Sequence, residues 1–301
     1  MTKTFYSNGK LLISGEYGVL DGALALAVPT KFGQSLTVSP SINGDIRWVS
    51  LDLKGQPWFD VTFNHDLQIL DASDVGMANS LKGILTETRY LNPSFLVSSD
   101  GYSIHTKLGF PRQWGLGSSS TLINNIASWA NVDPYLLLEK TFGGSGYDIA
   151  CAQIDSPITF RLHNGKPKVE PIAFDPSYAT HLYFVYRNRK QDSREAIARY
   201  RKGNFEKPTL IRQLTLLTRS MLKDNSVEEF QYLMESHENV LSKVLQKPPI
   251  KEELFDDFEG SIKSLGGWGG DFILACSTKK PFDYFKDKGF ETVLPYDQMV
   301  L

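Results

Sequence analysis

The chain has 301 residues, 41% of them hydrophobic, and a formal net charge of −2 at pH 7, so it can form two cores or one large domain with an appendage. Charges of both signs are spread along it and no apolar run reaches spanning length, which excludes nucleic acid and membranes as partners. Two separated cysteines and five scattered histidines exclude a disulfide framework and a zinc cage. The N-terminus lacks the apolar core of a signal peptide, and we expect a cytoplasmic protein.

The first unusual stretch, residues 9–22, is rich in glycine. Its apolar residues predict a short strand over 10–14, which breaks at a glycine and continues into a tight bend. Lys10 lies at the entrance of this strand, where its side chain can reach out of the sheet. Taken alone, such a lysine is more often an edge residue in water. Glu16 and Tyr17 lie in the bend and would otherwise be ordinary loop residues.

A β-rich passage comes next. The apolar run over 23–28 predicts a strand that is closed by Pro29. Residues 35–39 and 46–51 flank an Asn-Gly pair at 43–44, which is the strongest short signal for a hairpin. We therefore expect these two segments to pair with each other.

Helical periodicity over 74–91 and a strand over 102–108 lead to the second glycine stretch, residues 114–121, which reads Trp-Gly-Leu-Gly-Ser-Ser-Ser-Thr. The apolar spacing over 122–130 predicts that a helix begins at its serines. A helix start offers free N–H groups and a positive dipole end, which suit phosphate, and a serine hydroxyl can also reach a metal ion. No lysine follows the glycines, as a Walker loop requires, and the third glycine of a dinucleotide fingerprint is missing. A capped helix after a turn is the structural alternative.

A further Gly-Gly-Ser-Gly segment begins at residue 143 and places Asp148 at the mouth of an apolar helix. A carboxylate there is also stabilised by the helix dipole alone, which is the structural alternative to a catalytic role. Residues 158–162 and 168–172 then predict a hairpin around the Asn-Gly pair at 164–165.

Composition changes near residue 175, and we expect domains at 1–175 and 176–301. The second contains a strand over 181–186, several helices, and a glycine cluster at 266–271 that leads into a buried strand. One of these helices is predicted to begin with a capping box at Ser226-Val-Glu-Glu229. Strands and helices in this order predict an α+β fold class.

The stretches at 9–22, 115–120 and 266–271 resemble, in this order, the three motifs of the GHMP kinases, the kinases of galactose, homoserine, mevalonate and phosphomevalonate. Residues 15–20 and 144–150 are most similar to the mevalonate kinases and, more closely, the phosphomevalonate kinases. The resemblance implies a two-domain GHMP kinase fold, with an N-terminal α+β domain, a C-terminal ferredoxin-like α+β domain, and ATP and Mg²⁺ between them.

By this resemblance, Asp148 is the aspartate usually assigned as base for the substrate hydroxyl, Lys10 is the lysine of the first motif, and Ser119 ligates Mg²⁺. Asp148 next to Lys10 would keep its carboxylate ionised, because an opposite charge within a few ångströms favours the charged form. The resemblance assigns the ATP triphosphate to Gly115, Leu116, Gly117, Ser118, Ser119 and Ser120. It assigns contacts with the substrate to Glu16, Tyr17, Lys190, Ser193, Arg194, Gly267 and Gly269.

The chain departs from the family pattern at several positions. Asn8 replaces the usual proline, Tyr17 stands where mevalonate kinases usually have histidine, and Trp268 occupies a position that is normally small. Mevalonate kinases carry a metal-binding glutamate at a set distance before the catalytic aspartate. In this chain Leu137 occupies the position at that distance, and Glu139, two residues later, is the candidate for the second metal contact.

The sequence thus predicts an ATP-dependent kinase that phosphorylates mevalonate or phosphomevalonate, a small-molecule substrate. The cations and serine of the loop after the strand over 181–186 favour a substrate that already bears a phosphate. Alternatives are a kinase for another alcohol such as a sugar or homoserine, a diphosphomevalonate decarboxylase, and a catalytically inactive sensor that binds nucleotide and metabolite. The oligomeric state is left open, with a homodimer among the alternatives.

Overall fold

A computed structural model describes residues 1–189, 193–268 and 270–301, and the side chains of these except at 193–196. Contacts between residues divide the chain into two compact units. Unit 1 comprises Met1–Gly9, Phe32–Arg112 and Leu116–Gln153, and unit 2 comprises Lys10–Lys31, Gln113–Gly115 and Ile154–Leu301. Strands β1 (Lys3–Ser14) and β2 (Ala25–Pro40) contribute residues to both units. The units therefore do not follow one boundary, and the domains expected at 1–175 and 176–301 stay a prediction.

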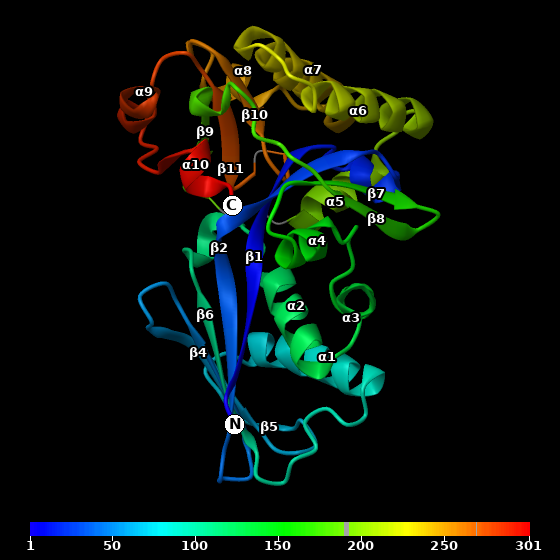
Figure 1. The fold of residues 1–301 in the computed structure, drawn as a ribbon, viewed down its shortest axis with the longest axis vertical. Coiled ribbons are helices and arrows are strands. Elements are labelled where there is room, and N and C mark those ends of the chain that lie inside the picture. Colours follow the sequence, from blue (N-terminus) through cyan, green and yellow to red (C-terminus); the bar gives the residue numbers. More distant parts are fainter. Residues whose placement is uncertain (190–192, 269) are drawn as a thin grey trace. The chain divides into compact units, whose positions relative to one another are not determined.

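Unit 1 is a sheet covered by helices. Its further elements are β3 (Ile46–Leu51), β4 (Pro57–Phe63), β5 (Ile69–Ala72), β6 (Tyr102–Leu108), α1 (Val75–Leu91), α2 (Ser118–Ala130), α3 (Pro134–Thr141) and α4 (Tyr147–Gln153). The strands lie in the order β5-β4-β3-β6-β2, and β1 pairs with β2. Apolar residues of the sheet and of α1, α2 and α3 form one buried cluster, and these helices cover the same side of the sheet (Figure 1).

The hairpin expected between 35–39 and 46–51 is wrong. Strand β6 lies between β2 and β3, so that Ile104 is opposite Val38 on one side and Trp48 on the other. All three side chains are buried. The Asn-Gly turn signal is local, whereas burial of these apolar residues is decided by a strand that comes much later in the chain.

The strand expected to end at Pro29 also continues further than predicted. Strand β2 pairs with β7 over Ala25–Ala27 and with β6 over Gln34–Pro40. Pro29 lies between these two paired stretches, where neither ladder needs its missing N–H. The proline is therefore accommodated within one long strand.

Unit 2 contains a hairpin and a second sheet. Its elements are η1 (Gly18–Asp21), β7 (Ile158–His163), β8 (Lys166–Pro171), η3 (Ala179–His181), β9 (Leu182–Tyr186), α5 (Ser193–Lys202), α6 (Lys207–Met221), α7 (Val227–Leu245), α8 (Ile250–Leu254), β10 (Ser261–Ser264), β11 (Phe272–Cys276), α9 (Phe282–Asp287), β12 (Val293–Pro295) and α10 (Tyr296–Met299). The short helix η2 (Arg112–Trp114) lies where the chain passes between the units. The second sheet has the order β10-β11-β9-β12 and is antiparallel throughout. Helix α7 packs on β10 and beside α6 (Figure 1).

Several local predictions are confirmed. The β7–β8 hairpin turns at Asn164 and Gly165, whose φ values of 51° and 75° suit a tight turn between strands. Helix α7 begins with the capping box of Ser226 and Glu229. The α+β fold class is confirmed in both units. None of the helices in the described part of the chain is long and apolar enough to cross a membrane.

Candidate functional site

The predicted phosphate loop has the backbone that its glycines suggested. Gly115 and Gly117 have φ values of 64° and 92°, a region that residues with side chains seldom adopt. Gly117 is the N-cap of α2 and has no side chain to occupy the first N–H groups of the helix. Leu116 between them is fully buried and anchors the loop. The start of α2 therefore presents amide donors without a capping side chain at Gly117.

The three serines at the start of α2 have different surroundings. The Ser120 hydroxyl is buried and donates to the carbonyl oxygen of Gly117 at 2.9 Å. Ser118 is half-buried, and Ser119 is exposed. Ser119 is therefore the most exposed of the three serines, and its assignment as a Mg²⁺ ligand stays a prediction.

Residues from all three glycine stretches meet within unit 2. The Lys10 ammonium donates to the carbonyl oxygen of Gly115 at 3.2 Å. A Cβ atom added to Gly115 would lie 1.8 Å from Oδ2 of Asp271, so the aspartate packs directly against the glycine. The rings of Trp114 and Phe272 also contact each other, with centroids 5.5 Å apart. Sequence reasoning named Asp271 only as the end of the third stretch, and its place after a glycine cluster was the available signal.

Unit 1 holds Asp148 on a helix that is fastened to α2. Asp148 is half-buried in the first turn of α4, and its Oδ1 accepts the Ile149 N–H at 3.2 Å. Later in α4, the Gln153 amide donates to Asn124 Oδ1 on α2 at 2.9 Å. The next residue of α2, Asn125, donates to the Gln34 carbonyl of β2 at 2.9 Å. Within unit 1, helix α2, which begins at Ser118, therefore packs against helix α4, which carries Asp148.

Lys10 belongs to unit 2 and Asp148 to unit 1. The predicted pairing of their charges stays a prediction. Burial raises the pKa of the Tyr135 phenol on α3 to about 12. The charges of Cys151, Asp133 and Asp148 make smaller contributions to this rise.

The metal assignment of Glu139 also stays a prediction. Glu139 is exposed on α3, and Leu137, at the position where the family has its glutamate, is fully buried in the core of unit 1. Across the described residues, no three His, Cys, Asp or Glu side chains gather as a metal site. The exposed Ser119 hydroxyl stays the predicted Mg²⁺ contact, and one such contact is compatible with Mg²⁺, which keeps waters and phosphate oxygens and needs few protein ligands.

Glu16 and Tyr17, expected to contact substrate, have protein partners in unit 2. Glu16 is 2% exposed and accepts a hydrogen bond from the ammonium of Lys263. The Tyr17 hydroxyl accepts the N–H of Trp268 at 2.6 Å. Tyr17 also stacks on Tyr200, with ring centroids 5.3 Å apart. Tyr17 and Trp268, which both depart from the family pattern, therefore contact each other.

The remaining expected substrate contacts are only partly described. Lys190 and Gly269 lie outside the described residues, as do the side chains of Ser193 and Arg194, whose backbone begins α5. Gly267 is half-buried in the third stretch, and its carbonyl oxygen would lie 2.7 Å from a Cβ atom at Gly270. This turn is therefore too tight for a side chain at residue 270.

A buried arginine that sequence reasoning treated only as part of a loop lies beside this turn. Arg187 is 7% exposed, and its backbone N–H donates to the carbonyl oxygen of Asp271 at 2.9 Å. Burial and the nearby Arg189 lower the pKa of the Arg187 guanidinium. The residue that follows β9 is thus bonded through its backbone to the end of the third glycine stretch.

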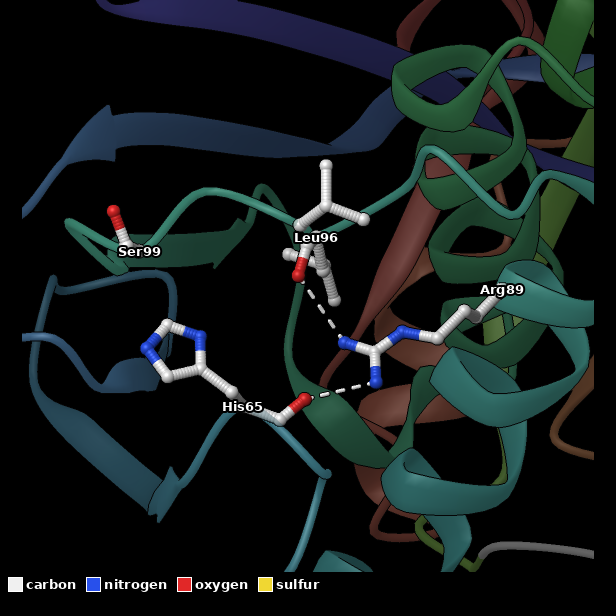
Figure 2. Close-up of a pocket in the computed structure, with 5 residues that line it drawn as sticks. His65, Arg89, Leu96 and Ser99 are labelled. Carbon is white, nitrogen blue, oxygen red and sulfur yellow. Dashed lines mark hydrogen bonds between the residues drawn. The ribbon is translucent and has the colours of Figure 1, made fainter.

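A pocket of about 340 Å³ in unit 1 is a separate feature (Figure 2). It is lined by His65, Arg89, Leu96, Val97 and Ser99. The Arg89 guanidinium donates to the carbonyl oxygens of His65 at 2.8 Å and Leu96 at 3.2 Å, which ties α1 to two loops. The predicted site residues that the structure describes are not among its lining residues, so this pocket is not the candidate site.

Comparison with solved structures finds the same fold in known kinases. The chain is similar to the mevalonate kinase of Methanococcus jannaschii, with a TM-score of 0.71, 17% identity, and coverage of 97% of this chain and 96% of that one. It is similar to the phosphomevalonate kinase of Streptococcus pneumoniae, solved with phosphomevalonate and AMPPNP, with a TM-score of 0.70, 15% identity, and coverage of 97% and 99%. The Lactococcus lactis galactokinase, solved with galactose, gives a TM-score of 0.70 at 13% identity over 95% and 88%.

No family model and no curated protein matches the chain. The likeness to solved structures covers nearly the whole chain, and it shows that the protein has the fold of the GHMP kinases, with the mevalonate kinases among its structural neighbours. The resemblance recognised in the glycine stretches is thereby confirmed as a resemblance of fold.

Proposed function

We propose that the protein is an ATP-dependent kinase that transfers the γ-phosphoryl group of ATP to mevalonate or phosphomevalonate. The observation that carries the proposal is the meeting of Lys10, Gly115 and Asp271 in unit 2, in a chain with the fold of small-molecule kinases. The hydrogen bond from Lys10 to Gly115 joins the cation of the first glycine stretch to the loop of the second. The proposal includes a cytoplasmic location and, from the resemblance, a homodimer as one candidate assembly.

Phosphoryl transfer requires positioning and charge neutralisation rather than covalent chemistry by the protein. The amides at the start of α2 suit phosphate oxygens, and the exposed Ser119 hydroxyl suits Mg²⁺, which when bound neutralises charge on the triphosphate. Lys10 supplies a fixed cation at Gly115. Asp148 orients the attacking hydroxyl and accepts its proton late in the transfer.

The test is ADP production by the purified protein with Mg-ATP and a panel containing mevalonate, phosphomevalonate, galactose and homoserine. We expect turnover well above background hydrolysis with mevalonate or its phosphate. Turnover with galactose alone would favour the second candidate, a sugar kinase, which the likeness to the galactokinase supports. Nucleotide binding without turnover on any alcohol would indicate a sensor instead.

The two serines give a matched test of the metal assignment. Ser119→Ala should raise the Mg²⁺ concentration needed for half-maximal activity, because an exposed hydroxyl at the ligand position is lost. Ser120→Ala should do less, because its hydroxyl is already bonded to Gly117. A Mg²⁺ titration in which wild type and Ser119→Ala coincide would reduce Ser119 to an ordinary residue of the helix start.

The choice of substrate is tested at the loop before α5. If Lys190 and Arg194 bind a substrate phosphate, replacing either with alanine removes a charge-assisted contact of about 1.5–3 kcal/mol. KM for phosphomevalonate should then rise by roughly tenfold or more, while KM for mevalonate changes little. Equal effects on the two compounds, or a wild-type enzyme that ignores phosphomevalonate, would overturn this preference.

A further inference from the structure

Unit 2 contains a buried cluster of charged and titratable side chains beneath the first glycine stretch. Glu16 follows β1, Lys263 lies on β10, and His237 and Glu238 lie on α7. Their exposed fractions are 2%, 0%, 0% and 1%. Burying charges is costly unless they are paired, so the contacts within this cluster determine what it can do.

The central contact is the ion pair between Glu16 and Lys263. The Lys263 ammonium donates to Glu16 Oε1 and, at 2.8 Å, to the carbonyl oxygen of Ser264. Burial raises the pKa of Glu16 to about 6, and the Lys263 charge and hydrogen bond oppose that rise. The two residues are 247 positions apart in the chain. The pair therefore fastens the first glycine stretch to the strand that leads into the third.

Helix α7 holds the same loop from another side. His237 Nε2 accepts the backbone N–H of Gly15 at 3.0 Å and lies 3.2 Å from Glu16 Oε2. A nitrogen that accepts an amide hydrogen carries no proton, so the imidazole is neutral, and burial together with Lys263 holds its pKa well below the usual value. Glu238 accepts the backbone N–H of Ser264 at 3.1 Å. Helix α7 is thus hydrogen-bonded to the residue before Glu16 and to the residue after Lys263.

The backbone at this point has little freedom to adjust by itself. Gly15 has a φ of 89°, and a Cβ atom there would lie 2.8 Å from the Cα of Ala25. Tyr17 has a φ of 62°, which is strained for a residue with a large side chain. One partner of each residue, Lys263 for Glu16 and Trp268 for Tyr17, comes from the same segment of the chain, so this segment supports the conformation of the bend.

We propose that Glu16 and Lys263 are positioning residues, and that their ion pair sets the relative placement of Lys10 on β1 and Asp271 at the end of the third glycine stretch. The inference rests on the proposed kinase activity and adds to it a device that holds the cation at Gly115. Stability alone does not require an ion pair here, because apolar residues of similar volume are often as stabilising. A directional pair fixes the relative placement of two segments in a way that apolar contacts do not.

The test separates positioning from stability with a double substitution. Lys263→Met alone leaves a buried carboxylate without its cation and should unfold at a lower temperature. The double variant Glu16→Leu/Lys263→Met removes both charges and should regain a melting temperature near that of wild type. Its matched control is Glu259→Leu/Lys279→Met, which makes the same changes in an exposed ion pair of unit 2.

For the folded double variant we expect kcat to fall on the order of tenfold to a hundredfold, with KM for the alcohol changed less than about threefold. Amide hydrogen exchange should quicken in peptides covering residues 10–18 and 113–117 but remain as in wild type elsewhere. The control variant should match wild type in both measurements. Unchanged exchange in these peptides, or wild-type kcat, in the folded double variant would overturn the positioning role. A wild-type protein without turnover on any alcohol would overturn the kinase proposal instead, and the exchange comparison would still decide the positioning role.

Discussion

Asp148→Asn should lower kcat by roughly two orders of magnitude or more, which is the scale of losing a positioned acid–base group. The asparagine keeps the shape of the side chain and its place in the first turn of α4, so the fold and ATP affinity should change little. The measurements are steady-state kinetics on the active alcohol and calorimetric binding of ATP. Asp71→Asn, an exposed aspartate of β5, is the matched control. Near wild-type turnover in a folded Asp148→Asn protein would remove this carboxylate from the mechanism.

Lys10→Met should have an effect of similar size through a different physical cause. The substitution removes the ammonium that donates to Gly115 at 3.2 Å. In the proposed mechanism it also removes a fixed positive charge where charge would develop during transfer. We expect kcat to fall by roughly two orders of magnitude, with a small change in ATP affinity.

The matched control for this lysine is Lys3→Met, an exposed lysine on the same strand. Lys10→Arg keeps the charge but changes the donor geometry, so it should retain part of the lost activity. If Lys10→Met binds ATP far more weakly while kcat is unchanged, the lysine serves nucleotide binding rather than catalysis.

The roles of all the predicted site residues continue as predictions, and the second metal contact is the one that the surroundings of its residues support least. Glu139 is exposed on α3, while Leu137 fills the family position with a core side chain. In the proposed kinase, Ser119, phosphate oxygens and water would hold Mg²⁺. Glu139→Gln would therefore be expected to change the Mg²⁺ requirement less than Ser119→Ala does.

Parts of the candidate site could be predicted because their signals are local. Glycines with positive φ, serines at a helix start and an apolar stripe over one helix are properties of a few neighbouring residues. Lys10 and Gly115 were named in this way, from two glycine stretches. That Lys10 donates to the Gly115 carbonyl could not be read from either stretch, because the contact joins residues 105 positions apart.

The sequence by itself determined the elements whose stability lies within one turn or one helix. These include the capping box of α7, the Asn164-Gly165 hairpin and the glycine-led start of α2. Local hydrogen bonds and backbone preferences decide such features, so nearby residues are sufficient to predict them.

Only the tertiary structure decided which strand lies between β2 and β3, and which partners Glu16 and Tyr17 have. Ile104 displaced the expected hairpin because three apolar side chains are buried together when β6 lies between its neighbours. From its neighbours alone, Glu16 is an ordinary loop residue. In the structure it is buried and forms an ion pair with Lys263, which lies 247 positions away in the chain. Burial and charge pairing depend on what the whole chain brings to one place, and no local pattern carries that information.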